Sequence, residues 1–174
     1  MATRASQSRQ FGLRVATGRR GVAFHVGSGV HITAAHCVNA FTEGAVVYTF
    51  GTDAQLTRLL AGDAAVMMTR ESPDRVFTLS TTDDPAPVVG STLSFECWRS
   101  GHAIGTLRVV SAASDALIAK PEGPVRALPG DSGAPVYWPS SGHVVGLIRG
   151  AIGPGVLQNQ IVIQRLEARM AGRC

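Results

Sequence analysis

This sequence has few cysteines from which disulfide bonds could form. The 174 residues include three cysteines, Cys37, Cys97 and Cys174, which are odd in number and isolated from one another. Small secreted proteins held together by disulfides carry many paired cysteines, so this class is excluded. We expect the protein to work in a reducing compartment with these cysteines as thiols.

Long apolar runs are also missing. No stretch approaches the roughly 18 consecutive apolar residues that a membrane-spanning helix requires. Residues 1–20 carry five arginines and no apolar segment, which is not the pattern of a secretory signal peptide. We therefore expect neither a membrane span nor a secretion signal in this sequence.

Charge is sparse, and lysine is nearly absent. Charged residues make up 16% of the chain, aromatic residues 6%, and the formal net charge is +4. Lys120 is the only lysine, so the positive charge comes from arginines, which are scattered apart from the pair Arg19 and Arg20. Nucleic-acid-binding surfaces gather basic residues and interleave them with aromatic ones. We expect a solvated surface and no specific nucleic-acid partner.

Glycine, proline and apolar residues are abundant by contrast. The chain has 20 glycines, nine prolines and 45% apolar residues. Many short apolar runs without helical spacing between them predict an all-β protein with two β-barrels. We expect strands at 13–16, 21–26, 30–34, 44–50, 63–68, 91–98, 104–110, 117–119, 136–138, 144–149 and 160–163, and a short helix at 166–170. The polar, proline-containing residues 71–87 predict the connection between two units, 1–80 and 81–174, of one compact protein.

A candidate nucleophile lies in the second unit. Residues 130–135 read Gly-Asp-Ser-Gly-Ala-Pro. A serine hydroxyl is a weak nucleophile until a base takes its proton, and the oxyanion formed by its attack needs hydrogen-bond donors. Gly130 permits a sharp turn that points its N–H and that of Ser132 at one spot, which predicts an oxyanion hole. This hexapeptide resembles the nucleophile loop of chymotrypsin-like serine proteases, usually written Gly-Asp-Ser-Gly-Gly-Pro.

A candidate base lies in the first unit. Residues 33–37 read Thr-Ala-Ala-His-Cys, which resembles the histidine motif of the same family, and His36 precedes Ser132 as in that family. The chemistry also needs a fixed, partly buried carboxylate that holds the imidazole tautomer. Asp63, which opens a small apolar strand, resembles the aspartate motif of the family. Asp53 is the rival, although its neighbours Gly51 and Thr52 predict a turn.

The resemblance implies a particular architecture. The fold would be two antiparallel six-stranded β-barrels with a short C-terminal helix, with His36 and Asp63 on the first barrel and Ser132 on the second. The active site would be the cleft between the barrels. Residues 132–137 and 141–151 are most similar to the nonstructural serine proteases of hepaciviruses and pegiviruses. Residues 129–133 also resemble the alphavirus capsid protease and the arterivirus main proteases.

The same resemblance implies where a peptide would bind. The strand at 147–150 would pair with the substrate backbone. An apolar primary specificity pocket, formed with Leu128, Ile148 and Ala151, would favour an apolar or small residue before the scissile bond. If Arg126 or Arg149 pointed inward, an acidic residue would be preferred instead. The implied substrate-binding residues are Leu128, Leu147, Ile148, Arg149, Gly150 and Ala151.

We expect no metal and no cofactor. Hepacivirus proteases carry a structural zinc held by cysteines and a histidine, but here only Cys97 and His143 are candidate donors for a site that takes four ligands. We interpret these two and His102 as structural or surface residues. In secreted trypsin-like enzymes the cysteine after the catalytic histidine pairs with one on the preceding strand. The strand before Cys37, residues 22–26, offers no such partner.

Three functions fit these motifs. The first is a serine endopeptidase that processes a viral polyprotein in the host-cell cytoplasm, with flanking polyprotein regions as a route to membrane association. Its partner would be a polypeptide substrate, and some small viral proteases of this type also borrow a strand from an activating cofactor peptide. The second is a bacterial trypsin-like protease, which a signal peptide or paired cysteines would favour. The third is a capsid or binding module that cleaves itself once, and turnover of a separate peptide would distinguish it from the first.

Overall fold

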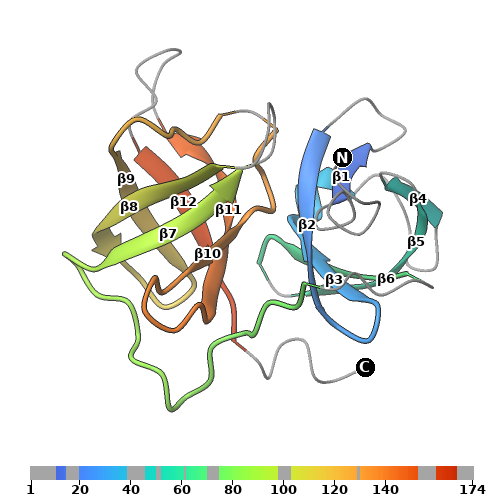
Figure 1. The fold of residues 1–174 in the computed structure, drawn as a ribbon, viewed down its shortest axis with the longest axis horizontal. Coiled ribbons are helices and arrows are strands. Elements are labelled where there is room, and N and C mark those ends of the chain that lie inside the picture. Colours follow the sequence, from blue (N-terminus) through green and yellow to red (C-terminus); the bar gives the residue numbers. More distant parts are fainter. Residues whose placement is uncertain are drawn as a thin grey trace, which may run out of the picture.

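Two β-barrels lie side by side in the computed structural model of this chain (Figure 1). The structure describes residues 11–14, 20–38, 46–49, 52–60, 62–69, 75–97, 103–128, 130–152 and 160–167. Both barrels are closed and all neighbouring strands within them are antiparallel, which confirms the predicted all-β double barrel. In the part of the chain that the structure describes, no helix has the length and apolarity needed to cross a membrane.

The first barrel contains the strands of the N-terminal part of the chain. Its strands follow the order β1-β2-β3-β6-β5-β4. They are β1 (Phe11–Arg14), β2 (Arg20–Gly27), β3 (Val30–Thr33), β4 (Val46–Thr49), β5 (Thr52–Leu60) and β6 (Ala64–Thr69), with a 3₁₀ turn η1 (Ala35–Cys37) after β3. Of the turn predicted at Gly51 and Thr52, Gly51 lies outside the described residues and Thr52 begins β5, where it pairs with Thr49 of β4.

The second barrel repeats the strand order of the first, as β7-β8-β9-β12-β11-β10. Its strands are β7 (Thr92–Cys97), β8 (Ala103–Ala112), β9 (Ala116–Glu122), β10 (Pro135–Tyr137), β11 (Val144–Ile152) and β12 (Gln160–Arg165). Of the helix expected at 166–170, only Leu166 and Glu167 are described, and neither is helical. The predicted division between residues 80 and 81 falls in the segment that joins β6 to β7.

The two barrels share apolar surface. Phe24, Ile32 and Met67 of the first barrel belong to one buried cluster with Tyr137 and Leu147 of the second. In the reverse direction, Val22 of β2 belongs to the core of the second barrel, which is built around Phe95, Leu107 and Ile163. Burial of apolar area therefore holds the barrels against each other, which matters for any site built from both.

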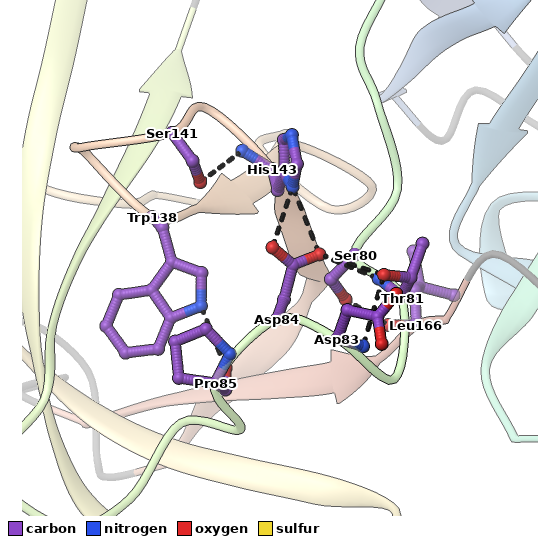
Figure 2. A network of polar contacts seen from close by, with 9 residues as sticks. All are labelled: Ser80, Thr81, Asp83, Asp84, Pro85, Trp138, Ser141, His143 and Leu166. Atoms are coloured by element: carbon purple, nitrogen blue, oxygen red, sulfur yellow. Dashed lines mark hydrogen bonds and ion pairs between the residues drawn. The ribbon is translucent and has the colours of Figure 1, made fainter.

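The connecting segment is fastened to the second barrel by a network of hydrogen bonds (Figure 2). The Asp84 carboxylate lies 2.9 and 3.0 Å from Nδ1 of His143 and accepts the backbone N–H of Thr81 at 2.8 Å. The Thr81 N–H, followed by His143, lowers the pKa of Asp84. Trp138 Nε1 donates to the carbonyl of Pro85 at 3.1 Å. His143 is therefore a structural residue that holds the connection, in agreement with its interpretation from the sequence.

A buried ion pair fastens the same segment closer to the first barrel. The Glu96 carboxylate of β7 is fully buried, and it accepts hydrogen bonds from both terminal nitrogens of the Arg75 guanidinium and from the Tyr137 hydroxyl. Arg75 also lies over the ring of Phe77, 4.3 Å from its centroid, and its carbonyl lies 3.1 Å from Nδ1 of His25 in β2. This cluster thus links β2, the connecting segment and the second barrel.

We expect Arg75→Ala to lower the free energy of unfolding by about 3 kcal/mol. The change would leave the Glu96 carboxylate buried without its cation, which is strongly destabilising. Because the Arg75 side chain is 34% exposed, the low end of the range for buried pairs applies. Urea denaturation measures the change. Arg108→Ala is the matched control, since its ion pair with Glu122 is exposed and is worth about 0–1 kcal/mol; equal losses for the two variants would contradict the assignment.

Candidate active site

Strand pairing brings His36 and Asp63 to the same end of the first barrel. Thr33, the last residue of β3, pairs with Ala65 near the start of β6 in the antiparallel sheet. The chain leaves β3 into η1, which carries His36, and enters β6 from the turn that carries Asp63. Both side chains therefore extend from the same end of this strand pair, as the position of the two motifs beside strands predicts.

The Asp63 carboxylate contacts His36 at two points. Its Oδ2 atom lies 2.5 Å from Nδ1 of the imidazole, and its Oδ1 atom accepts the backbone N–H of His36 at 2.8 Å. Since the ionised carboxylate is an acceptor only, Nδ1 carries the proton and Nε2 is the nitrogen left to act as a base. Two hydrogen bonds to one residue also fix the orientation of the ring. The bond between His36 and Asp63 is the one expected of the candidate aspartate at the start of β6.

The electrostatics of the pair favour an ionised Asp63. Burial raises the pKa of the Asp63 carboxyl, but the hydrogen bonds from the His36 ring and backbone, together with the nearby Arg149, outweigh burial and bring this pKa below its usual value. In return, the hydrogen bond to Asp63 is the largest cause that raises the pKa of His36, with a second contribution from Cys37, against the lowering effect of burial. The Asp63 carboxylate is therefore the anion that stabilises the protonated imidazole of His36.

The predicted nucleophile loop is a tight turn built on two glycines. Gly130 and Gly133 have φ angles of +101° and +92°, which side chains other than glycine rarely adopt. Asp131 between them is fully buried; its Oδ2 atom accepts the N–H of Leu128 at 2.8 Å, and its carbonyl accepts that of Ala134 at 2.9 Å. The Asp131 side chain thus closes the loop from inside.

The loop is bonded to the first barrel next to the histidine turn. The carbonyl of Ser132 accepts the N–H of Val22 in β2 at 2.7 Å. A Cβ on Gly133 would lie 2.0 Å from the carbonyl oxygen of Val22 and 3.1 Å from the nitrogen of Ala34, so a side chain does not fit there. Since Ala34 immediately precedes η1, the structure brings Ser132 and His36 to the same junction between the barrels.

A cleft of about 800 Å³ opens beside His36 and Asp63. Its far wall is the end of β11, where Arg149, Gly150 and Ala151 lie, and the Arg149 Nε atom is 3.9 Å from Oδ2 of Asp63. Arg149 therefore points toward the Asp63 side of the cleft. The remaining lining residues are Ala35, Gly62 and Val162.

The other predicted substrate-binding residues are placed differently. The side chains of Leu147 and Ile148 are buried, Leu147 in the cluster shared by the barrels and Ile148 in the core of the second barrel. Leu128 is 49% exposed just before the nucleophile loop. β10 pairs with β11 only as far as Leu147, whereas β12 pairs with it on the other edge up to Ile152. Among the described residues no strand covers the first edge beyond Ile148, which leaves it open to an added strand.

The cysteines and the second candidate zinc donor lie in separate places. Cys37 is buried in the core shared by the barrels and Cys97 in the core of the second barrel. A Cβ on Gly21 of β2 would lie 2.5 Å from the Cys37 sulfur, so the Cys37 thiol leaves no room for a side chain at position 21. Nδ1 of His143 is bonded to Asp84. His102 and Cys174 lie outside the described residues.

Solved structures with this arrangement of strands are numerous. A serine protease of a human pathogenic astrovirus matches with a TM-score of 0.70 at 17% identity, covering 94% of this chain and 92% of that one. The active form of the Rv3671c protease from M. tuberculosis matches with a TM-score of 0.67 at 16% identity, covering 97% and 84%. This chain has the chymotrypsin-like fold. The scabies mite inactivated protease paralogue S-D1 matches with a TM-score of 0.69 at 15% identity, covering 92% and 88%.

Comparison with family models and with curated proteins finds no match. At these identities the structures establish the chymotrypsin-like fold alone. Because an inactivated paralogue shares it, the case for catalysis depends on the residues of this site.

We expect Asp63→Asn to lower the pKa of the His36 imidazole. The amide cannot supply the negative charge that stabilises the protonated ring, and this hydrogen bond is the largest cause of the raised pKa. An NMR titration of the imidazole protons measures the change. Asp53→Asn, in β5, is the matched control and should leave the titration of His36 unchanged; a shift in the control alone would contradict the pairing.

Proposed function

We propose that this chain is a serine endopeptidase with a His36-Asp63-Ser132 triad. The observation that carries the proposal is the doubly bonded Asp63–His36 pair, which lies at the barrel junction to which the Ser132 loop is also bonded. In this mechanism Ser132 Oγ attacks the scissile carbonyl while Nε2 of His36 takes its proton. The N–H groups of Gly130 and Ser132 stabilise the oxyanion.

The remaining steps follow from the same groups. His36 returns the proton to the leaving amine, and the acyl group stays on Ser132 Oγ. A water molecule, deprotonated by His36, then attacks the ester; His36 returns that proton to Ser132 Oγ as the acid leaves, which restores the serine hydroxyl. Asp63 stays ionised throughout and stabilises the imidazolium of each transition state. His36 must be neutral to begin the cycle, so activity should fall as the pH is lowered through its pKa.

The proposed substrate is an extended peptide that adds to the open edge of β11. An extended chain would satisfy the backbone groups beyond Ile148 and lie across the cleft beside His36. The exposed Leu128, just before the Ser132 loop, favours an apolar or small residue before the scissile bond. Arg149 points toward Asp63, with its Nε atom 3.9 Å from Oδ2 of that carboxylate.

Processing of a viral polyprotein is the physiological role that we propose. It is supported by the resemblance of residues 132–137 and 141–151 to viral proteases and by the structural likeness to an astrovirus serine protease. An activating cofactor peptide that supplies a strand is part of this proposal, because several small viral proteases use one. Sequencing the products from a library of peptides added separately would define the specificity and distinguish turnover from a single self-cleavage.

We expect Ser132→Ala to reduce hydrolysis of a separate peptide by a factor on the order of 10⁶ while the fold is kept. The change removes the nucleophile, and alanine fits a position that is already half-buried. Peptide cleavage and circular dichroism measure the two properties. Ser141→Ala, in the β10–β11 turn, is the matched control. Comparable turnover by Ser132→Ala and the control would rule out the serine-protease mechanism.

We propose the host-cell cytoplasm as the place of action, because Cys37 and Cys97 are buried in different clusters. We expect the enzyme to be fully active in millimolar reductant and in chelator. Mass spectrometry after alkylation of the unfolded, unreduced protein should show three modified thiols. An intramolecular bridge, or activity lost in chelator and restored by zinc, would contradict this proposal.

A further inference from the structure

A glutamine of the second barrel reaches the proposed catalytic aspartate of the first. Gln164 lies in β12, and its side-chain oxygen accepts the backbone N–H of Asp63 at 2.9 Å, although the two residues are 101 positions apart. Gln164 is 3% exposed. A buried polar side chain must satisfy its hydrogen-bonding groups, so this contact is a constraint on both barrels.

The remaining contacts of the Gln164 amide fix its orientation. Nε2 donates to the carbonyl of Asp115, in the β8–β9 turn, at 3.0 Å, and lies 3.5 Å from that of Arg165. Both partners are acceptors, so the nitrogen must face them and the oxygen must face Asp63. The Asp115 carbonyl also accepts the N–H of Arg165, which ties this turn to β12.

The Gly62–Asp63 turn is shaped to admit the amide. Gly62 has a φ of +77°, and a Cβ at this position would lie 2.5 Å from the side-chain oxygen of Gln164. Only a glycine leaves room for the amide and adopts this backbone conformation without strain. The turn that presents Asp63 to His36 is therefore packed directly against β12.

We propose that Gln164 is the positioning residue of the catalytic aspartate. It holds the backbone of Asp63 in place, so that the two carboxylate oxygens reach the ring and the N–H of His36 together. Without this acceptor, the partly buried Asp63 N–H would lose its hydrogen-bond partner, and the turn would move to find another one. The inference rests on the proposed function, since it assigns Gln164 a part in the same triad.

The proposal predicts an effect on His36, which Gln164 acts on through Asp63. Among the described residues, the titratable and charged groups around the imidazole are Asp63, Cys37 of η1 and, beyond the carboxylate, Arg149 of β11. On the Gln164 side, the guanidinium of Arg165 is bonded to the carbonyl of Ala113. A change confined to the Gln164 amide leaves all these groups in the chain, so a shift of the His36 titration would report a displaced Asp63.

The test compares Gln164→Met with wild type. Methionine has a similar length and volume but neither an acceptor for Asp63 nor a donor for Asp115. We expect kcat for a peptide substrate to fall by about 10- to 100-fold, the cost typical of removing a group that orients a functional side chain, with a much smaller change in KM. We also expect the NMR-measured pKa of His36 to fall, because a loosened carboxylate stabilises the imidazolium less.

Ser80→Ala is the matched control. It removes another buried side-chain bond at the end of β12, from Ser80 Oγ to the carbonyl of Leu166 at 3.3 Å, without touching Asp63. The control should leave kcat and the His36 pKa unchanged even where it lowers stability. If Gln164→Met matches wild type, or if it loses activity with no shift in the His36 pKa, the positioning role is overturned.

A second variant covers the case in which Gln164→Met does not fold. Gln164→Glu keeps an acceptor oxygen for Asp63, so the His36 pKa should stay at or above its wild-type value, and a lower value would overturn the proposal. The His36 titration can be measured in a protein that cleaves nothing. It therefore tests the positioning role of Gln164 separately from the protease function. If wild type cleaves no peptide but Gln164→Met lowers the pKa, the positioning role stands and the protease function fails. If wild type cleaves the peptide but Gln164→Met leaves the His36 pKa unchanged, the protease function stands and the positioning role fails.

Discussion

The hydrogen bond from the Val22 N–H to the Ser132 carbonyl is the contact on which the proposed site depends. It joins β2 of the first barrel to the nucleophile loop of the second, at the point where Gly133 leaves no room for a side chain. A triad divided between two barrels works only while their relative position is fixed within a fraction of an ångström. Non-directional burial of apolar area brings the barrels together, but directed bonds such as this one define how they fit.

Two further sets of polar contacts restrict the position of one barrel relative to the other. Arg75 and Glu96 fasten the connecting segment near β2, and Asp84 and His143 fasten it to the β10–β11 turn. A buried pair such as the first costs desolvation of both charges and is weak evidence for stability by itself. Its geometry is nevertheless specific, because the Glu96 oxygens are shared between Arg75 and the Tyr137 hydroxyl. These contacts hold the described part of the connecting segment, residues 75–91, against both barrels.

What the sequence could predict was local. His36 and Ser132 lie in contiguous motifs because their turns need particular neighbours, and Asp63 was found because a short apolar strand follows it. β5 was missed because polar residues such as Asp53 and Arg58 interrupt its apolar pattern, although it pairs on both edges. Gln164 carries no local signal: it is an ordinary residue of an alternating strand, and its contact with Asp63 arises only when the barrels are packed together. Glu96 was hidden for the same reason, since its cation comes from a different segment.

The position of Asp63 shows why the long-range contacts matter for the chemistry. Burial alone would raise the pKa of this carboxyl and weaken it as a partner for an imidazolium. Two bonds from His36 and the Arg149 guanidinium reverse that tendency, and both act on the carboxylate oxygens. Gln164 contributes no charge, yet it holds the backbone from which those oxygens project. A peptide that covered the cleft would exclude water from this group and strengthen each of its interactions. Substrate binding would then tighten the arrangement that cleavage requires, at the cleft wall formed by β11.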